Sequence, residues 1–210
     1  QDKRDDLAEV YSVVTRWVFS LSLPLGVLAV VYRADLLGFF GAEFTAGTLV
    51  LALFVVGQLC LVGTGPSDSL LMMTEHQYVV MANEWVFGLA NIALNYLCIQ
   101  AFGLTGAAVA SAGVLAVRNL TTVAELHYLE AIHPYSREFG KPVVAGVLAG
   151  GWMVVAAGSF SEVTAAVIGS AGGLLVYAGC LRVLGIEAVD YRLYRRLSEA
   201  RSEETQPADD

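Results

Sequence analysis

Polar side chains recur at helical spacing inside one long apolar stretch of this sequence. Glu84, Gly88, Asn91 and Asn95 stand at i, i+4, i+7 and i+11, so a helix that turns 100° per residue places them within about 60° of one another. A polar stripe is costly in hydrocarbon and must face a partner helix or a water-filled cavity. Both readings stay open here, because Asn91 and Asn95 could also bond to a neighbouring helix in a purely structural role.

A second stripe follows a short interruption in the apolar pattern. Its members stand at i, i+7, i+11 and i+14 and are Ser111, Arg118, Thr122 and Glu125. A turn centred near Ala101 and Phe102 would leave Glu84 about 17 residues before it and Arg118 about 17 after it. Antiparallel helices rise equally, about 1.5 Å per residue, so these two residues are predicted to lie at similar depth. The sequence therefore predicts an ion pair between Glu84 and Arg118, with a structural bridge and a gate as alternative roles.

Two further polar residues are candidates for the same cavity wall. Gln58 stands alone in another apolar stretch, and Arg16 begins the first one. With Glu84, Asn91, Asn95 and Arg118 they complete the set of predicted cavity-lining residues. No Gly-rich phosphate loop, Ser/His/Asp set or Cys/His cluster accompanies them. We therefore expect no enzyme, no metal site, no cofactor apart from coupling to a proton or sodium gradient, and no nucleic-acid partner.

The composition points to a membrane protein. Hydrophobic residues make up 56% of the chain and charged residues 15%, whereas soluble domains carry about 25% charged residues. Mean hydropathy is +0.62. Five runs lack Asp, Glu, Lys and Arg, namely 17–32, 44–67, 85–117, 142–161 and 163–181. A spanning helix needs about 20 apolar residues, so the 33-residue run is predicted to be a hairpin of two helices.

The expected fold class is all-α, a polytopic bundle of about six transmembrane helices. The predicted spans cover 14–32, 45–64, 78–98, 105–126, 142–159 and 163–184, and a connector at 33–43 is expected to lie near one interface. Gly65 and Pro66 break the second span, and Ser67 and Asp68 follow as a helix N-cap signal. Residues 1–185 are thus one six-helix lobe, and 186–210 are a basic amphipathic helix and an acidic disordered tail.

The distribution of basic residues predicts the orientation. With six spans, eleven of the twelve lie on the side that holds both termini and Arg33 alone lies on the other. Cytoplasmic loops carry the excess of Lys and Arg. The chain is therefore predicted to reside in the cell membrane with both termini in the cytoplasm.

The last two spans carry small-residue patterns rather than polar stripes. Gly146 and Gly150 are four residues apart, as are Gly169 and Gly173. Such patterns allow helix backbones to approach closely. We expect these glycines to pack helices together.

Several segments resemble the C-terminal domain of Wzx-type polysaccharide flippases, relatives of the MATE exporters and the lipid II flippase MurJ. The resemblance covers roughly residues 10 to 185 and rests on Ser22-Leu23-Pro24, Phe40-Gly41-Ala42-Glu43-Phe44, Gly65-Pro66 with Leu70-Leu71, Ala90-Asn91-Ile92-Ala93-Leu94-Asn95-Tyr96, and the run from Phe102 to Ser111.

The resemblance implies one lobe of a two-lobed, MATE-like transporter with a central cavity. Its expected partners are an isoprenoid-linked saccharide, membrane lipids and an N-terminal lobe of the same protein, since the sequence starts at Gln1 without a Met. The implied function is translocation of a lipid-linked oligosaccharide for surface polysaccharide or glycoprotein assembly. A cation-coupled small-molecule exporter, with Glu84 as the proton or sodium carboxylate, and a non-transporting membrane scaffold are the alternatives.

Overall fold

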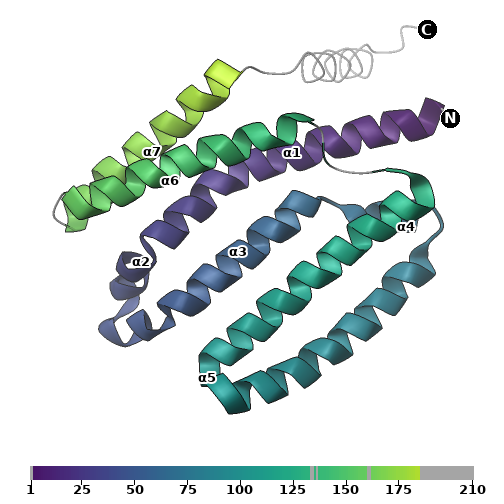
Figure 1. Cartoon of the computed structure of the whole chain (residues 1–210), viewed down its shortest axis with the longest axis horizontal. Helices are drawn as coiled ribbons and strands as arrows, with labels where there is room; N and C mark the ends of the chain where they lie inside the picture. Colours follow the sequence, from purple (N-terminus) through teal and green to yellow (C-terminus); the bar gives the residue numbers. More distant parts are fainter. Residues whose placement is uncertain (1, 133–134, 136, 160–161, 185–210) are drawn as a thin grey trace, which may run out of the picture.

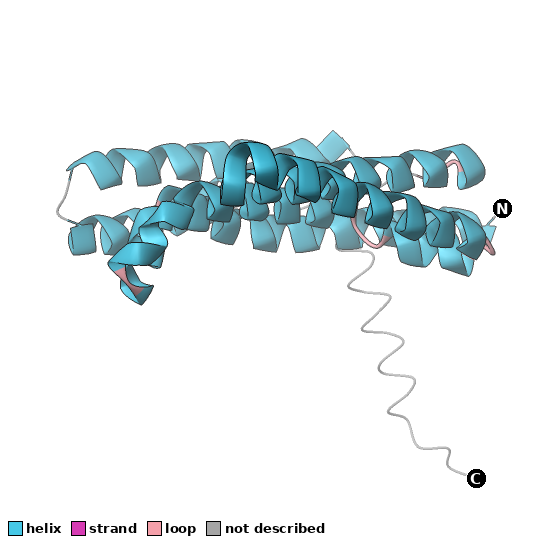
Figure 2. Ribbon diagram, turned by 90° about the horizontal axis from the view of Figure 1, so that it is seen from below, coloured by secondary structure: helices cyan, strands magenta, loops and turns pink. Residues whose placement is uncertain are grey.

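The computed structural model describes residues 2–132, 135, 137–159 and 162–184, and these residues are almost entirely helical. The predicted amphipathic helix and acidic tail at 186–210 lie outside the described residues. The all-α class is confirmed. The helices lie side by side in a row, in the order α7, α6, α1, α3 and α5 (Figure 1). Seen along the row, the bundle is a thin slab (Figure 2).

The first helix, α1 (Asp2–Val31), occupies the middle of the row and packs against both α3 and α6. It contains Pro24, and the predicted first span at 14–32 is its apolar part. Tyr32 ends α1, and its hydroxyl donates hydrogen bonds to the backbone oxygens of Ala165 (3.0 Å) and Met153 (3.3 Å). One side chain thus fixes the end of α1 to α7 and α6.

Two short helices, α2 (Arg33–Phe40) and the 3₁₀ helix η1 (Ala42–Gly47), connect α1 to α3 (Thr48–Thr64). After α3 the helix is interrupted at Gly65, which has φ +64°. A Cβ at Gly65 would overlap the Thr15 hydroxyl of α1, so the position requires glycine for both space and conformation.

The helix α4 (Ser67–Met73) begins where the sequence predicted a helix N-cap, but the capping prediction is wrong. Pro66 occupies the N-cap position and no side chain caps it. Ser67 instead donates its hydroxyl to the Thr64 carbonyl at 2.9 Å, and Asp68 bonds to Arg118 on α5. The early polar residues of α4 are therefore used in tertiary contacts, which a local capping pattern does not reveal.

The helix α5 (Gln77–Glu130) is 54 residues long and folds back on itself. Gly103 has φ 59° and ψ −139°, a non-helical conformation that favours glycine. Figure 1 shows the two arms, which we call the first arm (77–102) and the second arm (104–130), running back side by side. The predicted hairpin is confirmed, with its turn one residue beyond Phe102.

The helices α6 (Gly140–Ser159) and α7 (Glu162–Leu184) follow a 3₁₀ turn, η2 (Arg137–Phe139). A Cβ at Gly146 would press on Leu23 of α1, and one at Gly173 would press on Met153 of α6. The glycine patterns therefore bring helices into close contact, as predicted.

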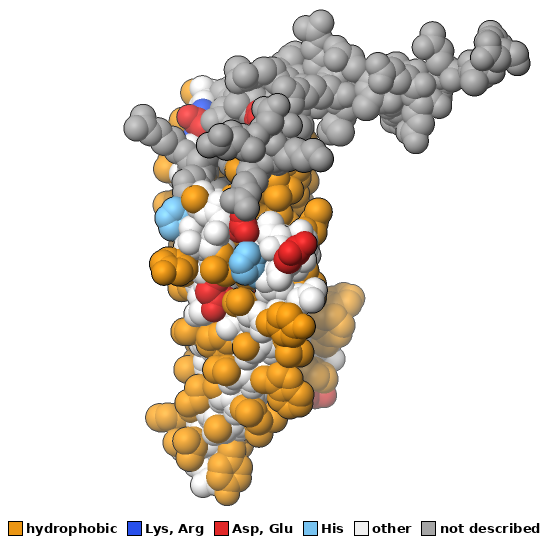
Figure 3. Space-filling view, turned by 90° about the vertical axis from the view of Figure 1, so that its right-hand side faces the viewer, with side chains coloured by type: hydrophobic (Ala, Val, Ile, Leu, Met, Phe, Trp, Pro, Cys, Tyr) orange, Lys and Arg blue, Asp and Glu red, His pale blue; other side chains and the backbone are white. Residues whose placement is uncertain are grey.

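Within the described residues, five helical stretches are long and apolar enough to cross a membrane, one of them the 54-residue hairpin. They are Leu7–Val31, Ala42–Met73, Gln77–Glu130, Gly140–Ser159 and Thr164–Leu184. Large hydrophobic side chains on these helices are widely exposed, and Figure 3 shows them covering the visible side of the bundle while acidic and His side chains gather towards one end. This surface suits hydrocarbon and is consistent with a multi-pass membrane protein.

Candidate substrate pathway

The polar stripes on the two arms of α5 face each other. Near the turn, the Asn95 side-chain amide donates to the Ser111 hydroxyl at 3.1 Å. The same nitrogen lies 2.8 Å from the Asn91 side-chain oxygen, one helical turn away. Asn91, Asn95 and Ser111 thus form a first polar rung between the arms, which is the neighbouring-helix bonding that the sequence left open.

Arg118 forms a second rung and pairs with two carboxylates. Its guanidinium contacts Glu84 of the first arm, so the predicted ion pair is confirmed. The same nitrogen lies 2.8 Å from Asp68 of α4, which the sequence analysis did not predict. Arg118 is one-fifth exposed, whereas Glu84 is 59% exposed. The Arg118 guanidinium therefore pairs with two carboxylates. The more exposed of them, Glu84, belongs to the first arm.

Two more contacts join the arms towards their ends. The Asn83 amide donates to the Glu125 carboxylate at 2.5 Å. His76 precedes α5, and its Nδ1 lies 3.5 Å from the carboxylate of Glu130, which is almost fully buried. The hairpin thus brings Glu130 next to His76.

The contacts between the two arms follow from the position of the turn at Gly103. Asn95 and Ser111 each lie eight residues from Gly103, and His76 and Glu130 each lie 27 from it. Glu84 and Arg118 are offset by four residues, about 6 Å at 1.5 Å per residue, a span that an extended arginine side chain covers. The hairpin alone sets the register of the rungs.

The two arms differ in how much they bury. α5 is described throughout and has ten buried residues, and Val80 alone lies in the first arm. The second arm packs on α3, where Ala112 and Leu115 lie next to Gly57. The first arm is the outer edge of the row (Figure 1). Polar rungs, and one apolar contact that Val80 makes in a cluster with Leu71 and Leu126, connect it to the rest of the bundle.

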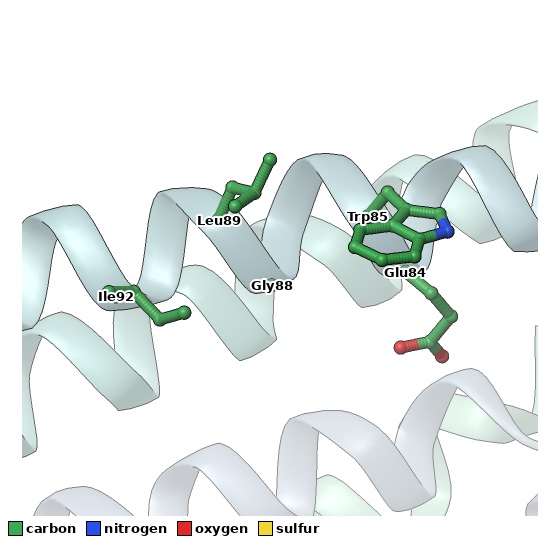
Figure 4. Close-up of a pocket in the computed structure, with 5 residues that line it drawn as sticks. All are labelled: Glu84, Trp85, Gly88, Leu89 and Ile92. Atoms are coloured by element: carbon green, nitrogen blue, oxygen red, sulfur yellow. The ribbon is translucent and has the colours of Figure 1, made fainter.

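An open depression of about 330 Å³ lies on the first arm beside the second rung. It is lined by Glu84, Trp85, Gly88, Leu89 and Ile92. Gly88 leaves space because nothing lies within 4 Å of where its Cβ would be. Figure 4 shows the Glu84 side chain at one end of this region and Ile92 at the other. The depression thus places a carboxylate next to an apolar wall.

The remaining predicted residues lie on other helices. Gln58 is exposed on α3, and the structure shows no hydrogen bond from it to the described residues. Arg16 is buried on α1, with 7% of its surface exposed, and is held by contacts there. The cavity-lining role of both residues stays a prediction.

Sequence reasoning missed Asp68 and Asn83. Asp68 follows the helix break at Gly65, and helical periodicity does not predict where residues after such a break lie. Asn83 lies about 100° from Glu84 on the helix and so falls outside the polar stripe. The unpartnered acidic residue of the second stripe, Glu125, was the available signal for a polar neighbour such as Asn83.

Within the described residues, no group of three or more His, Cys, Asp and Glu side chains is arranged to hold a metal ion. Comparison of the chain with protein-family models, curated proteins and solved structures finds no match.

Proposed function

We propose that this chain is one lobe of a MATE-like transporter that translocates a lipid-linked oligosaccharide across the cell membrane. The proposal includes six membrane crossings, with each arm of α5 counted as one, because each arm exceeds the roughly 20 residues that a span needs. The described ends at Asp2 and Leu184 lie towards the same end of the bundle (Figure 1), as an even number of crossings requires. Eleven basic residues on that side favour cytoplasmic termini.

The observation that carries the proposal is the ladder of polar rungs on an arm that has almost no buried residues. Asn91 and Asn95 offer amides, and Ser111 offers a hydroxyl, all within apolar helices. Such groups can exchange their mutual hydrogen bonds for bonds to sugar hydroxyls with little net cost. Arg118 supplies a cation that can pair with a phosphate. The resemblance to Wzx-type flippases agrees with this chemistry.

A binding measurement tests the function without requiring a second lobe for transport. The full chain is reconstituted in nanodiscs, and its affinity is measured for a polyprenyl-pyrophosphate tetrasaccharide and for the matching polyprenyl alcohol. We expect the saccharide lipid to bind at least tenfold more tightly than the alcohol, since one charge-assisted hydrogen bond is worth about 1.5 kcal/mol. Arg118→Gln should remove most of that preference.

Gln100→Ala is the control, because Gln100 is an exposed polar residue of the same hairpin. It should leave the preference unchanged. Equal affinity for the two lipids, or equal losses in both variants, would contradict the flippase proposal. Absence of binding to any transported lipid or ion would instead favour a membrane scaffold.

A cation-coupled exporter is the second candidate. The charges grouped around Arg118 favour it. Asp68 and Glu84 share one guanidinium nitrogen, so this local group carries one negative charge in excess. A proton or sodium ion at Glu84 would remove that excess. Binding of sodium to the nanodisc-embedded chain that is lost in Glu84→Gln, together with indifference to the saccharide lipid, would replace the flippase by the exporter.

A further inference from the structure

The connector between α1 and α3 is folded although it has no core. All of residues 33–47 are described, and none of them is buried in α2 or η1. Three aromatic side chains are prominently exposed, with Phe39 at 88%, Phe40 at 72% and Phe44 at 52%. Exposing phenyl rings to water is unfavourable. The connector therefore needs a contact that the described part of the chain does not supply.

The backbone of this connector is nevertheless well defined. Arg33 donates to the Val30 carbonyl at 2.7 Å, and the Gly41 amide donates to the Gly38 carbonyl at 3.1 Å. Thr45 closes η1 by donating its hydroxyl to the Ala42 carbonyl at 2.6 Å. Tyr32 immediately before it is tied to α6 and α7. The exposed rings are thus presented by an ordered segment that is anchored to the bundle.

The large apolar side chains of α2 lie on one side of the helix. At 100° per residue, Leu36, Leu37, Phe39 and Phe40 cover one continuous arc of about 160°. Ala34, Asp35 and Gly38 fall in the opposite arc. Arg33 is the exception, since it lies within the apolar arc, but its guanidinium bonds to the end of α1. One side of α2 thus carries the large apolar side chains, and the other carries Asp35 and two small residues.

The position in the fold identifies what covers this apolar side. The connector lies at the same end of the bundle as the α5 turn (Figure 1), and it leaves the slab at its left-hand end in Figure 2. In a membrane, helices of this length would end here, at the level of the lipid headgroups. Aromatic side chains concentrate at that level of membrane proteins. The apolar side of α2 continues the lipid-facing surface of the adjoining helices.

We propose that residues 33–47 are a membrane-surface anchor, lying in the headgroup layer at the end of the bundle away from the termini, with Phe39, Phe40 and Phe44 in the acyl boundary. The anchor carries Arg33, Asp35 and Glu43, a net charge of −1. Attraction to anionic lipids therefore contributes nothing, and a zwitterionic surface is the matching partner. The anchor fixes the depth of the joint between α1 and α3.

Electron paramagnetic resonance on the full chain tests this. Cys60, Cys98 and Cys180 are replaced by Ser, and a nitroxide is attached to a single new cysteine in phosphatidylcholine vesicles. The lipid-facing positions are Phe39→Cys, Phe40→Cys and Phe44→Cys, and the matched controls from the opposite arc are Ala34→Cys and Gly38→Cys. Changing one ring at a time leaves two others in place.

We expect the ratio of oxygen to water-soluble nickel collisions to be several-fold higher at 39, 40 and 44 than at 34 and 38. Added phosphatidylglycerol should leave this ratio unchanged. Equal ratios on the two arcs would overturn the anchor. Low collision rates with both reagents at the three aromatic positions would also overturn it, and spin–spin broadening would then identify a second copy as the partner. A depth that requires phosphatidylglycerol would overturn the choice of a zwitterionic surface.

Discussion

The block of α1, α6 and α7 and the first arm of α5 are attached to the molecule by opposite means. In the block, glycines let backbones approach, and Tyr32 and Tyr177 donate hydrogen bonds across helices to backbone carbonyls. In the first arm, the contacts are side-chain rungs to the second arm, and Val80 is the buried residue. Close packing is hard to rearrange, whereas hydrogen bonds can be exchanged for others of similar strength.

This difference teaches how one lobe can combine a rigid part with a movable wall. Regions with few buried apolar contacts open more readily than packed cores. The first arm meets that description and also carries Glu84, Asn91 and Asn95. Three of the residues proposed to meet substrate therefore lie on an arm with few buried contacts.

The largest expected difference in stability is between a glycine-to-leucine substitution in the block and the same substitution in the first arm. Gly169→Leu should destabilise the chain by about 1–3 kcal/mol, because its side chain would displace the Tyr32 hydroxyl from its two carbonyl partners. Gly88→Leu should change stability by less than about 0.5 kcal/mol, because nothing lies near its Cβ. Thermal unfolding of both variants in the same detergent measures this. Similar losses in the two variants would remove the contrast between block and arm.

Substitutions in the Arg118 rung should change the stability of the chain by an intermediate amount. Glu84→Arg should destabilise by about 1–2 kcal/mol, the value of a charged hydrogen bond reduced for the exposure of Glu84. Adding Arg118→Glu should restore part of this loss, but the new carboxylate would face Asp68. Asp68→Asn in the same chain should improve the rescue further. The three variants are compared by chemical unfolding, and a swap no better than Glu84→Arg would show that the pair is not coupled.

The hydrogen bond between Asn95 and Ser111 should make the smallest contribution to stability. Hydrogen bonds between membrane helices are worth about 0.6 kcal/mol on average. A double-mutant cycle of Asn95→Ala and Ser111→Ala should therefore show a coupling energy near that value. A coupling of several kcal/mol would make the first arm as firmly held as the block, contrary to our account.

The sequence contained enough to predict the hairpin and its ion pair. A 33-residue apolar run is too long for one span, and equal distances from the predicted turn near Ala101 and Phe102 place Glu84 close to Arg118. Both inferences use helical geometry alone. The glycine patterns on α6 and α7 were predictable for the same reason, since four-residue spacing places small residues on one face.

The rest required the three-dimensional path of the chain. Asp68 reaches Arg118 because α4, which begins after the helix break at Gly65, packs on α5, a tertiary contact without a periodic signal. The asymmetry between the arms was also hidden, because the apolar residues of both arms look alike in sequence. Which arm contacts α3 depends on the order of helices in the row.

The central claim is that the polar face of the first arm borders a water-filled pathway, and cysteine accessibility tests it most directly. Gly88→Cys lies on the rung face, and Val86→Cys lies about 160° away on the same arm and is 62% exposed. In membranes, with the three native cysteines replaced by Ser, a water-soluble methanethiosulfonate reagent should modify position 88 and leave position 86 unmodified. Equal protection of both positions, or faster reaction at 86, would contradict the account.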